Sequence, residues 1–278
     1  MTPIAREIDL RDEAVHVWSA ELDAPQWPVA ALEQTLSADE LRRAARYHFA
    51  VDRRRFVVRR ALLRLLLSRY TRTEPTDLEF RYGPAGKPEL AQSPGDAALR
   101  FSLSHTHGLA LFAIAWGRRI GVDVEALRPL PDFEAVARIC LTAREHARLR
   151  ALPAGRQCEA FFLAWTRKEA FVKATGEGLA LPPERIEVTI DPGEPAILYA
   201  VGGAPDAAAA WTLRTLPIGR THAGTVAVEG RVGRLVSRRL EPWSRAGRIA
   251  RASPHRTTAS RRSYATHTRR SASRGSPE

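Results

Sequence analysis

The stretch that most constrains the fold of this chain is a short apolar strand that carries two acids. Residues 120–125 read Ile-Gly-Val-Asp-Val-Glu, in which only Asp123 and Glu125 are ionisable. In an extended strand alternate side chains share a face, so both carboxylates point to the same side. Two acids on one face of an otherwise apolar strand favour a bound cation.

A second segment, further along the chain, offers complementary groups. Residues 165–173 are helical by composition, and Trp165, Glu169 and Lys173 fall at i, i+4 and i+8, on one side of a helix. If the strand and the helix pack together, three carboxylates converge beside a lysine. Oxygen ligands in this number match Mg²⁺, and the lysine adds a point charge for phosphate groups.

Each of these pairs also has an ordinary explanation. Asp123 and Glu125 would then end a strand in solvent, while Glu169 and Lys173 would form an exposed helix pair. Such i,i+4 pairs are common and individually weak, so neither segment establishes a site by itself.

Four blocks of the sequence together resemble the signature of a known family. They are residues 86–88 (Gly-Lys-Pro), 101–105 (Phe-Ser-Leu-Ser-His), 121–125 (Gly-Val-Asp-Val-Glu) and 165–179 (Trp-Thr-Arg-Lys-Glu-Ala-Phe-Val-Lys-Ala-Thr-Gly-Glu-Gly-Leu). Their order and spacing, within residues 37–180, are similar to those of the 4′-phosphopantetheinyl transferase superfamily. The similarity is to the surfactin-synthetase-activating type, a single chain with two related halves, rather than to the short trimeric type.

The element pattern and the resemblance predict the same fold. Helices combined with antiparallel strands occur in both halves, which is typical of an α+β protein rather than of alternating βαβ units. We expect two similar lobes, a pseudo-dimer, each a small antiparallel sheet packed with helices. The lobes span residues 1–118 and 119–230, and a disordered C-terminal tail spans 231–278. The expected elements are strands at 14–19, 99–105, 109–116, 120–125, 186–190, 196–201, 211–216 and 224–228, and helices at 38–47, 51–70, 133–140, 142–152 and 157–175.

The resemblance implies an enzyme that uses coenzyme A as its donor. Such an enzyme moves the 4′-phosphopantetheine arm onto a serine of an acyl or peptidyl carrier protein and releases adenosine 3′,5′-bisphosphate, for polyketide, nonribosomal peptide or fatty acid biosynthesis. In the family picture Mg²⁺ is held by Asp123, Glu125 and Glu169, and Lys173 stabilises charge on the phosphates. Glu169, directly or through a metal-bound water, takes the serine proton, and its two roles compete.

The resemblance also implies a set of coenzyme A contacts. The family positions for these contacts are occupied here by Arg43, Gly86, Lys87, Ser104, His105 and Lys173. Taken alone, a Gly-Lys-Pro turn and a histidine at the rim of a hairpin are ordinary features, although hydroxyls and imidazoles do suit phosphate oxygens. Ser102 stands where family members commonly carry asparagine, a departure that affects this position alone.

Other helix residues have a simpler interpretation. The arginines of the 51–70 helix are most simply a solvated face, with Arg60 structural or one step removed from the site. Trp165 and Phe171 are aromatic residues at helical spacing, which is typical of core packing. Cys140 and Cys158 show no metal-ligand spacing, which favours free thiols.

The net charge of +12 is concentrated at one end of the chain. Residues 231–278 hold thirteen arginines, no lysine and two glutamates, so this segment carries +11 and the rest of the chain +1. Its composition cannot bury enough apolar surface to offset chain entropy, which predicts disorder. It leaves an alternative function, a non-catalytic polyanion or nucleic-acid binder acting through the tail, although we expect no nucleic-acid partner.

The remaining features predict where the chain acts. No apolar run approaches the ~18 residues of a membrane span, and the first residues lack a signal-peptide pattern. We therefore expect a cytoplasmic monomer without a membrane partner.

Overall fold

The computed structural model describes residues 14–91 and 98–242. The first half of the chain combines five strands with three helices. Its strands are β1 (Ala14–Glu21), β2 (Phe80–Tyr82), β3 (Pro88–Leu90), β4 (Leu99–Thr106) and β5 (Leu109–Trp116), and its helices are α1 (Val29–Glu33), α2 (Ala38–Ala45) and α3 (Ala50–Thr71).

The second half has a comparable mixture and ends in an additional strand. Its strands are β6 (Ile120–Ala126), β7 (Ile186–Val188), β8 (Leu198–Val201), β9 (Trp211–Thr215), β10 (His222–Glu229) and β11 (Arg234–Arg239), and its helices are α4 (Phe133–Cys140), α5 (Ala143–Ala151), α6 (Ala154–Thr175) and α7 (Pro205–Ala209). These elements confirm the α+β class. None of the helices in the described ranges is long and apolar enough to span a bilayer.

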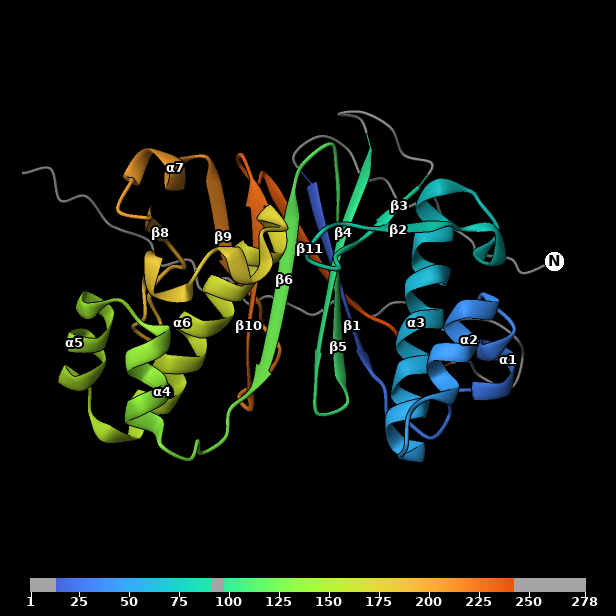
Figure 1. The fold of residues 1–278 in the computed structure, drawn as a ribbon, viewed down its shortest axis with the longest axis horizontal. Coiled ribbons are helices and arrows are strands. Elements are labelled where there is room, and N and C mark those ends of the chain that lie inside the picture. Colours follow the sequence, from blue (N-terminus) through green and yellow to red (C-terminus); the bar gives the residue numbers. More distant parts are fainter. Residues whose placement is uncertain (1–13, 92–97, 243–278) are drawn as a thin grey trace, which may run out of the picture.

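Two sheets stack between two long helices (Figure 1). One sheet has the order β11-β1-β5-β4 and the other the order β6-β10-β9. Helix α3 covers the outer face of the first sheet and α6 that of the second, so the layers run helix, sheet, sheet, helix. An apolar core between the sheets includes Val15, Val17, Val122 and Val124, and its burial from water joins the two halves.

The two halves repeat one local design, which confirms the expected pair of similar lobes. Glu40 and Glu145 each accept a hydrogen bond from the backbone N–H three residues earlier, at 3.0 and 2.8 Å, and so start α2 and α5 with a capping box. The same glutamates are buried against a cation at the fifteenth position of the next helix. These cations are Arg64 of α3, at 2.6 Å, and Lys168 of α6, at 2.5 Å.

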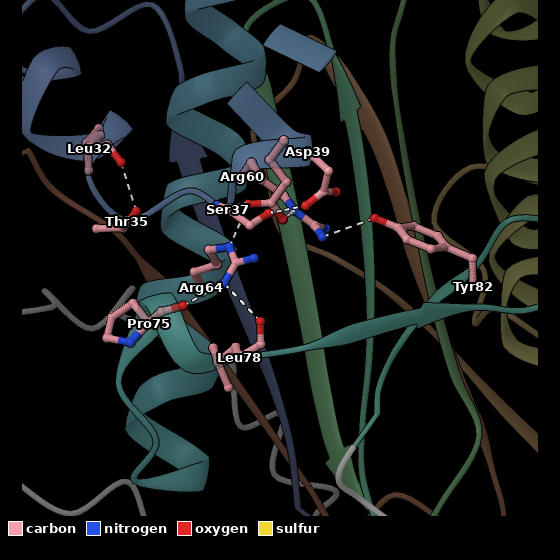
Figure 2. Close-up of polar contacts among 10 residues, drawn as sticks. Leu32, Thr35, Ser37, Asp39, Arg60, Arg64, Pro75, Leu78 and Tyr82 are labelled. Carbon is pink, nitrogen blue, oxygen red and sulfur yellow. Dashed lines mark hydrogen bonds and ion pairs between the residues drawn. The ribbon is translucent and has the colours of Figure 1, made fainter. Parts of the chain in front are cut away.

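The arginines of α3 correct the expectation of a solvated face. Arg60 and Arg64 are buried, and both donate to the Glu40 carboxylate. Arg64 also donates to the carbonyl oxygens of Pro75 (2.6 Å) and Leu78 (3.0 Å), as Figure 2 shows. A buried carboxylate is tolerated only when it is paired, so these arginines stabilise the first lobe. Arg60 is therefore structural, as expected.

Strand β11 corrects the expectation that the chain is disordered from residue 231 onward. It pairs parallel with β1, from Ala14 opposite Arg234 to Ser19 opposite Arg239, so the first sheet is not purely antiparallel. The next residue, Leu240, is buried, and its N–H donates to the Ser19 carbonyl oxygen (2.7 Å). The chain therefore returns from the second lobe to the first before the remainder of the tail, residues 243–278, which lies outside the described residues. The lobe boundaries at 118 and 230 stay a prediction.

Two truncations separate the role of β11 from that of the tail. Removal of residues 243–278 should leave the melting temperature within about 2 °C of the full chain, because no described contact is lost. Removal of residues 231–278 should lower it by about 5 °C or more, since Leu240 and the β1 edge are exposed. Differential scanning calorimetry of both truncated chains gives the comparison. Equal melting temperatures would show that β11 does not stabilise the first lobe.

Candidate active site

Gly121 allows α6 to lie directly on β6. A Cβ atom at this position would be 2.0 Å from the Ala170 carbonyl oxygen and 2.4 Å from the Ala174 amide nitrogen. Both are main-chain atoms of α6, so only glycine fits at this crossing. The acidic strand and the tryptophan-led helix therefore meet, as the sequence predicted.

Asp123 and Lys173 form the centre of this contact. Lys173 Nζ lies 2.5 Å from Asp123 Oδ1 and 3.0 Å from Ser104 Oγ. The Ser104 hydroxyl donates to the same carboxylate oxygen, at 2.8 Å. The other oxygen, Asp123 Oδ2, is buried and has no hydrogen-bond partner among the described residues. Since Ser104 belongs to β4 of the first lobe, the centre is built from both lobes.

Three hydroxyls at alternate positions of β4 face β6. Ser102 Oγ accepts a hydrogen bond from the Val122 N–H (3.1 Å), Ser104 bonds to Asp123 as described, and Thr106 Oγ1 donates to Glu125 Oε2 (3.5 Å). The period of two in the strand thus aligns the hydroxyls of one lobe with the acids of the other. Ser102 and Thr106 were not among the predicted site residues, although this alternation was available in the sequence.

Trp165 has a polar role that the packing assignment missed. Its ring stacks on Phe161 with the centroids 6.5 Å apart, so it does pack as expected. It also lies close enough to Glu125 for its indole N–H to lower the pKa of this carboxyl, against the larger effect of burial. The i,i+4 spacing from Trp165 to Glu169 places both on one helix face, and this spacing could have indicated that Trp165 lies at the site. Phe171 is buried in the core of the second lobe, as predicted.

The three acids lie within electrostatic range of one another. Burial raises the pKa of the Glu125 carboxyl, and the Asp123 carboxylate raises it further. Burial also raises the pKa of Glu169, where Asp123 and Glu125 add to the effect and Lys173 opposes it. Within residues 14–91 and 98–242, however, no three Asp, Glu, His or Cys side chains are gathered into a ready-made metal site.

Lys87 lies at the interface between the lobes. Its Nζ donates to the carbonyl oxygens of Ile120 (2.9 Å) and Ala174 (3.4 Å), and so links the start of β6 to the end of α6. Lys87 also lines a cavity of about 220 Å³, together with Arg100 and Arg119. Glu89 also lines this cavity and lies 3.5 Å from Arg100, so the three cations leave a net positive charge, which suits an anionic group such as a phosphate.

The partly buried position of Lys87 predicts a pH effect on stability. Burial lowers its pKa to about 8, from 10.5; Glu89 opposes this shift, while Arg100 and Arg119 add to it. Between these pH values the unfolded chain binds a proton that the folded chain does not, so folding becomes more favourable as the pH rises. The free energy of unfolding of the wild type, minus that of Lys87→Met, should increase by on the order of 1 kcal/mol from pH 8 to 10.5. Urea unfolding at several pH values measures the difference, and a difference that falls with pH would contradict this position for Lys87.

The other expected coenzyme contacts occupy different places. Gly86 lies in the turn between β2 and β3 with φ of +75°, a conformation that favours glycine. His105 is exposed near the end of β4. Arg43 is exposed on α2, with its guanidinium carbon 5.6 Å from the Phe56 ring centre. Because α2 lies on the outer side of α3, away from β6, the structure does not bring Arg43 to the carboxylates (Figure 1).

The matching surface of the first lobe lacks this chemistry. We align β1 with β6 through their valines in the inter-sheet core, and α3 with α6 through their first residues. The positions equivalent to Asp123, Glu125, Glu169 and Lys173 are then, in order, His16, Trp18, Leu65 and Arg69. Without the three acids, this surface offers no ligand set for a cation, so the repeat provides one candidate site.

Comparison with known families divides the chain in two. Residues 18–116 match the family described as "4'-phosphopantetheinyl transferase, N-terminal", and residues 119–227 match the "4'-phosphopantetheinyl transferase superfamily". The two matches meet at the connection between β5 and β6, where the repeated design begins again.

Curated relatives give the same result as the family matches. The 4'-phosphopantetheinyl transferase HetI of Nostoc is 40% identical over 228 residues, which cover 82% of this chain and 93% of HetI. The 4'-phosphopantetheinyl transferase Sfp of Bacillus subtilis is 28% identical over 56% of this chain and 66% of Sfp. A solved holo-(acyl-carrier-protein) synthase of Bacillus anthracis, in complex with CoA, is 22% identical over 40% of this chain and 95% of that one, with a TM-score of 0.33. The identity to HetI over most of both chains shows that this chain is an enzyme of the 4′-phosphopantetheinyl transferase superfamily.

Proposed function

We propose that this enzyme transfers the 4′-phosphopantetheine arm of coenzyme A to a serine of an acyl or peptidyl carrier protein. The observation that supports it most is the contact of Lys173 with Asp123 and Ser104, which sets an ammonium among three acids at the junction of the lobes. Phosphoryl transfer depends mainly on positioning and on the neutralisation of charge. These residues provide both functions.

In the proposed reaction, the serine oxygen of the carrier protein bonds to the pyrophosphate phosphorus that bears the pantetheine arm. The bond from this phosphorus to the bridging oxygen breaks, and that oxygen leaves with the electron pair as part of adenosine 3′,5′-bisphosphate. Glu169 accepts the serine proton. Lys173 donates hydrogen bonds to the phosphate oxygens and stabilises the charge that develops on them.

A divalent metal ion is in general use in this family. The residues of the site fit such an ion, because Asp123 Oδ2 is a buried carboxylate oxygen without a partner in the described part of the chain. Glu125 and Glu169 add further negative charge, and oxygen donors favour Mg²⁺ over softer metals. We propose that Asp123, Glu125 and Glu169 hold Mg²⁺, which when bound would neutralise charge on the pyrophosphate.

We place the anionic end of coenzyme A against the cavity lined by Lys87, Arg100 and Arg119. Gly86 precedes Lys87 in the turn. Ser104 and His105 lie near the end of β4, the strand to which Arg100 also belongs. All three residues stay proposed coenzyme contacts. Arg43 also stays a proposed contact, although the coenzyme would have to extend beyond α3 to reach it.

Mass spectrometry of a carrier protein tests this function. An apo-carrier protein incubated with the enzyme, coenzyme A and Mg²⁺ should gain the mass of one phosphopantetheine arm, and the gain should disappear when the acceptor serine is replaced by alanine. Adenosine 3′,5′-bisphosphate should form in equal amount. The proposal fails if apo-carrier proteins of acyl and peptidyl type all keep their original mass.

The alternative of a non-catalytic polyanion binder loses its support, because the chain belongs to an enzyme family. The tail beyond residue 242 still carries nine arginines and one glutamate. A chain without residues 243–278 should retain transfer activity, whereas a binder that acts through the tail would lose its partner. The cytoplasmic location and the monomeric state stay predictions.

A further inference from the structure

The segment from the middle of α2 to the start of α3 exposes four large apolar side chains. Leu41, Tyr47, Phe49 and Val51 are 39, 37, 63 and 46% exposed. They are four of the nine large apolar residues that are exposed in the described part of the chain, and all four lie within eleven consecutive residues. Large apolar side chains that are exposed within one short segment are typical of an interaction site.

Three exposed arginines interleave with these residues. Arg42, Arg43 and Arg46 form no ion pair with any carboxylate in the described ranges, and residues 41–51 contain no acid. Four arginines of α3 behave differently, because each of them pairs with a carboxylate inside the molecule. These partners are Glu33 for Arg53, Asp23 for Arg55, and Glu40 for Arg60 and Arg64. Residues 41–51 therefore carry three exposed arginines that no carboxylate of the described residues neutralises.

This segment lies at the same side of the molecule as the C-terminal end of β6, which carries the acids of the candidate site. The start of α3 and the ends of β4 and β6 lie at the same side (Figure 1). Arg55, in the second turn of α3, pairs with Asp23, whose carboxylate contacts the β4–β5 turn: a Cβ atom at Gly108 would be 2.4 Å from it. Two residues before this turn position, Thr106 bonds to Glu125. The start of α3 thus lies at the same end of the molecule as Glu125, and Asp23 and the β4–β5 turn lie between them.

We propose that residues 41–51, the α2–α3 patch, are the docking surface for the carrier protein. The apolar side chains form the buried centre of the contact, and Arg42 and Arg46 pair with acidic side chains of the partner at its rim. An acidic partner is required because the patch supplies only positive charge. The inference rests on the proposed function, since it locates the second substrate of that reaction.

Two double variants test the apolar and the charged parts of the patch. They are Phe49→Ala with Val51→Ala, and Arg42→Glu with Arg46→Glu. The matched control, Ile197→Ala with Arg185→Glu, changes an equally exposed apolar residue (42%) and an exposed arginine in the second lobe. Each protein is mixed with an apo-carrier protein whose acceptor serine is alanine, and the dissociation constant is measured by fluorescence anisotropy.

Both patch variants should raise this dissociation constant by about tenfold or more, while the control matches the wild type. The effect of the arginine pair should shrink at high salt, because the ion pairs are exposed. Coenzyme A affinity and the melting temperature should stay at wild-type values, and in the transfer assay KM for the carrier protein should rise without a change in kcat.

The docking inference is overturned if both patch variants bind the carrier protein as tightly as the wild type, or if the control weakens binding equally. Because the binding assay involves no transfer, it decides this inference independently of catalysis. A wild-type enzyme that binds the carrier protein at the patch but never modifies it would instead contradict the proposed function.

Discussion

Replacement of Glu169 by glutamine is expected to slow phosphopantetheine transfer by at least ~100-fold. Glu169 lies on α6 between Trp165 and Lys173, and its pKa responds to the carboxylates of Asp123 and Glu125. Glutamine keeps the shape of the side chain but can neither take the serine proton nor supply a charged ligand to Mg²⁺. The rate of carrier-protein modification, followed by intact mass at saturating coenzyme A, measures the loss.

Glu159→Gln is the matched control for this substitution. Glu159 lies on the same helix, is exposed, and pairs with Arg156 at 3.1 Å. It should transfer the arm at the wild-type rate, because an exposed ion pair contributes little and is remote from the acids of the site. A Glu169→Gln enzyme that is as fast as this control would exclude Glu169 from catalysis.

Replacement of Gly121 by alanine should destabilise the enzyme by about 3 kcal/mol and abolish transfer. The added methyl group would overlap the Ala170 carbonyl oxygen and the Ala174 amide nitrogen, which are main-chain atoms of α6. The helix must move off β6, and Lys173 then leaves Asp123. Urea unfolding gives the loss of stability, and the transfer assay, run on protein shown to be folded, gives the loss of activity.

Gly224→Ala provides the comparison within the same sheet. A Cβ atom at Gly224 would be 2.5 Å from Ile218 Cδ1, which is the end of a flexible side chain, so a rotamer change can accommodate it. We expect a cost below about 1 kcal/mol and nearly full activity. Equal effects at Gly121 and Gly224 would show that the contact between α6 and β6 does not require glycine.

The groups that face each other between β6 and α6 were predictable, because local periodicity determines which side chains share a face. The alternation in residues 120–125 placed both acids on one face, and the i,i+4 spacing from Trp165 to Lys173 placed the helix groups on one side. That these two faces pack against each other was a hypothesis, which the resemblance to the family favoured. The proximity of the Trp165 indole to Glu125 was not predicted, because an aromatic residue in an apolar helix is equally typical of core packing.

Strand β11 was not predictable from composition. An arginine-rich composition predicts a solvated segment, but long arginine side chains can also cover apolar surface with their aliphatic stems. Arg238 places its guanidinium carbon 5.3 Å from the Trp18 ring centre, and Arg239 pairs with Glu21 at 2.8 Å. Both contacts join segments far apart in the sequence, so they emerge only once β1 is in place.

The burial of Arg60 and Arg64 could not be predicted from the sequence for a related reason. Their shared partner, Glu40, lies on a different helix, and no local spacing connects α2 to the middle of α3. The capping box at Glu40 was recognisable, but its second function as the acceptor for two buried arginines depends on how the helices pack. Tertiary contacts therefore decided which arginines of α3 face solvent and which stabilise the core.

The most direct test of the site is the position of a bound metal ion in crystals grown with coenzyme A and Mn²⁺, located by anomalous scattering. We expect one peak, bounded by the carboxylates of Asp123, Glu125 and Glu169, with the coenzyme pyrophosphate beside Lys173. A peak elsewhere, with the coenzyme bound away from β6 and α6, would contradict the assignment of the active site.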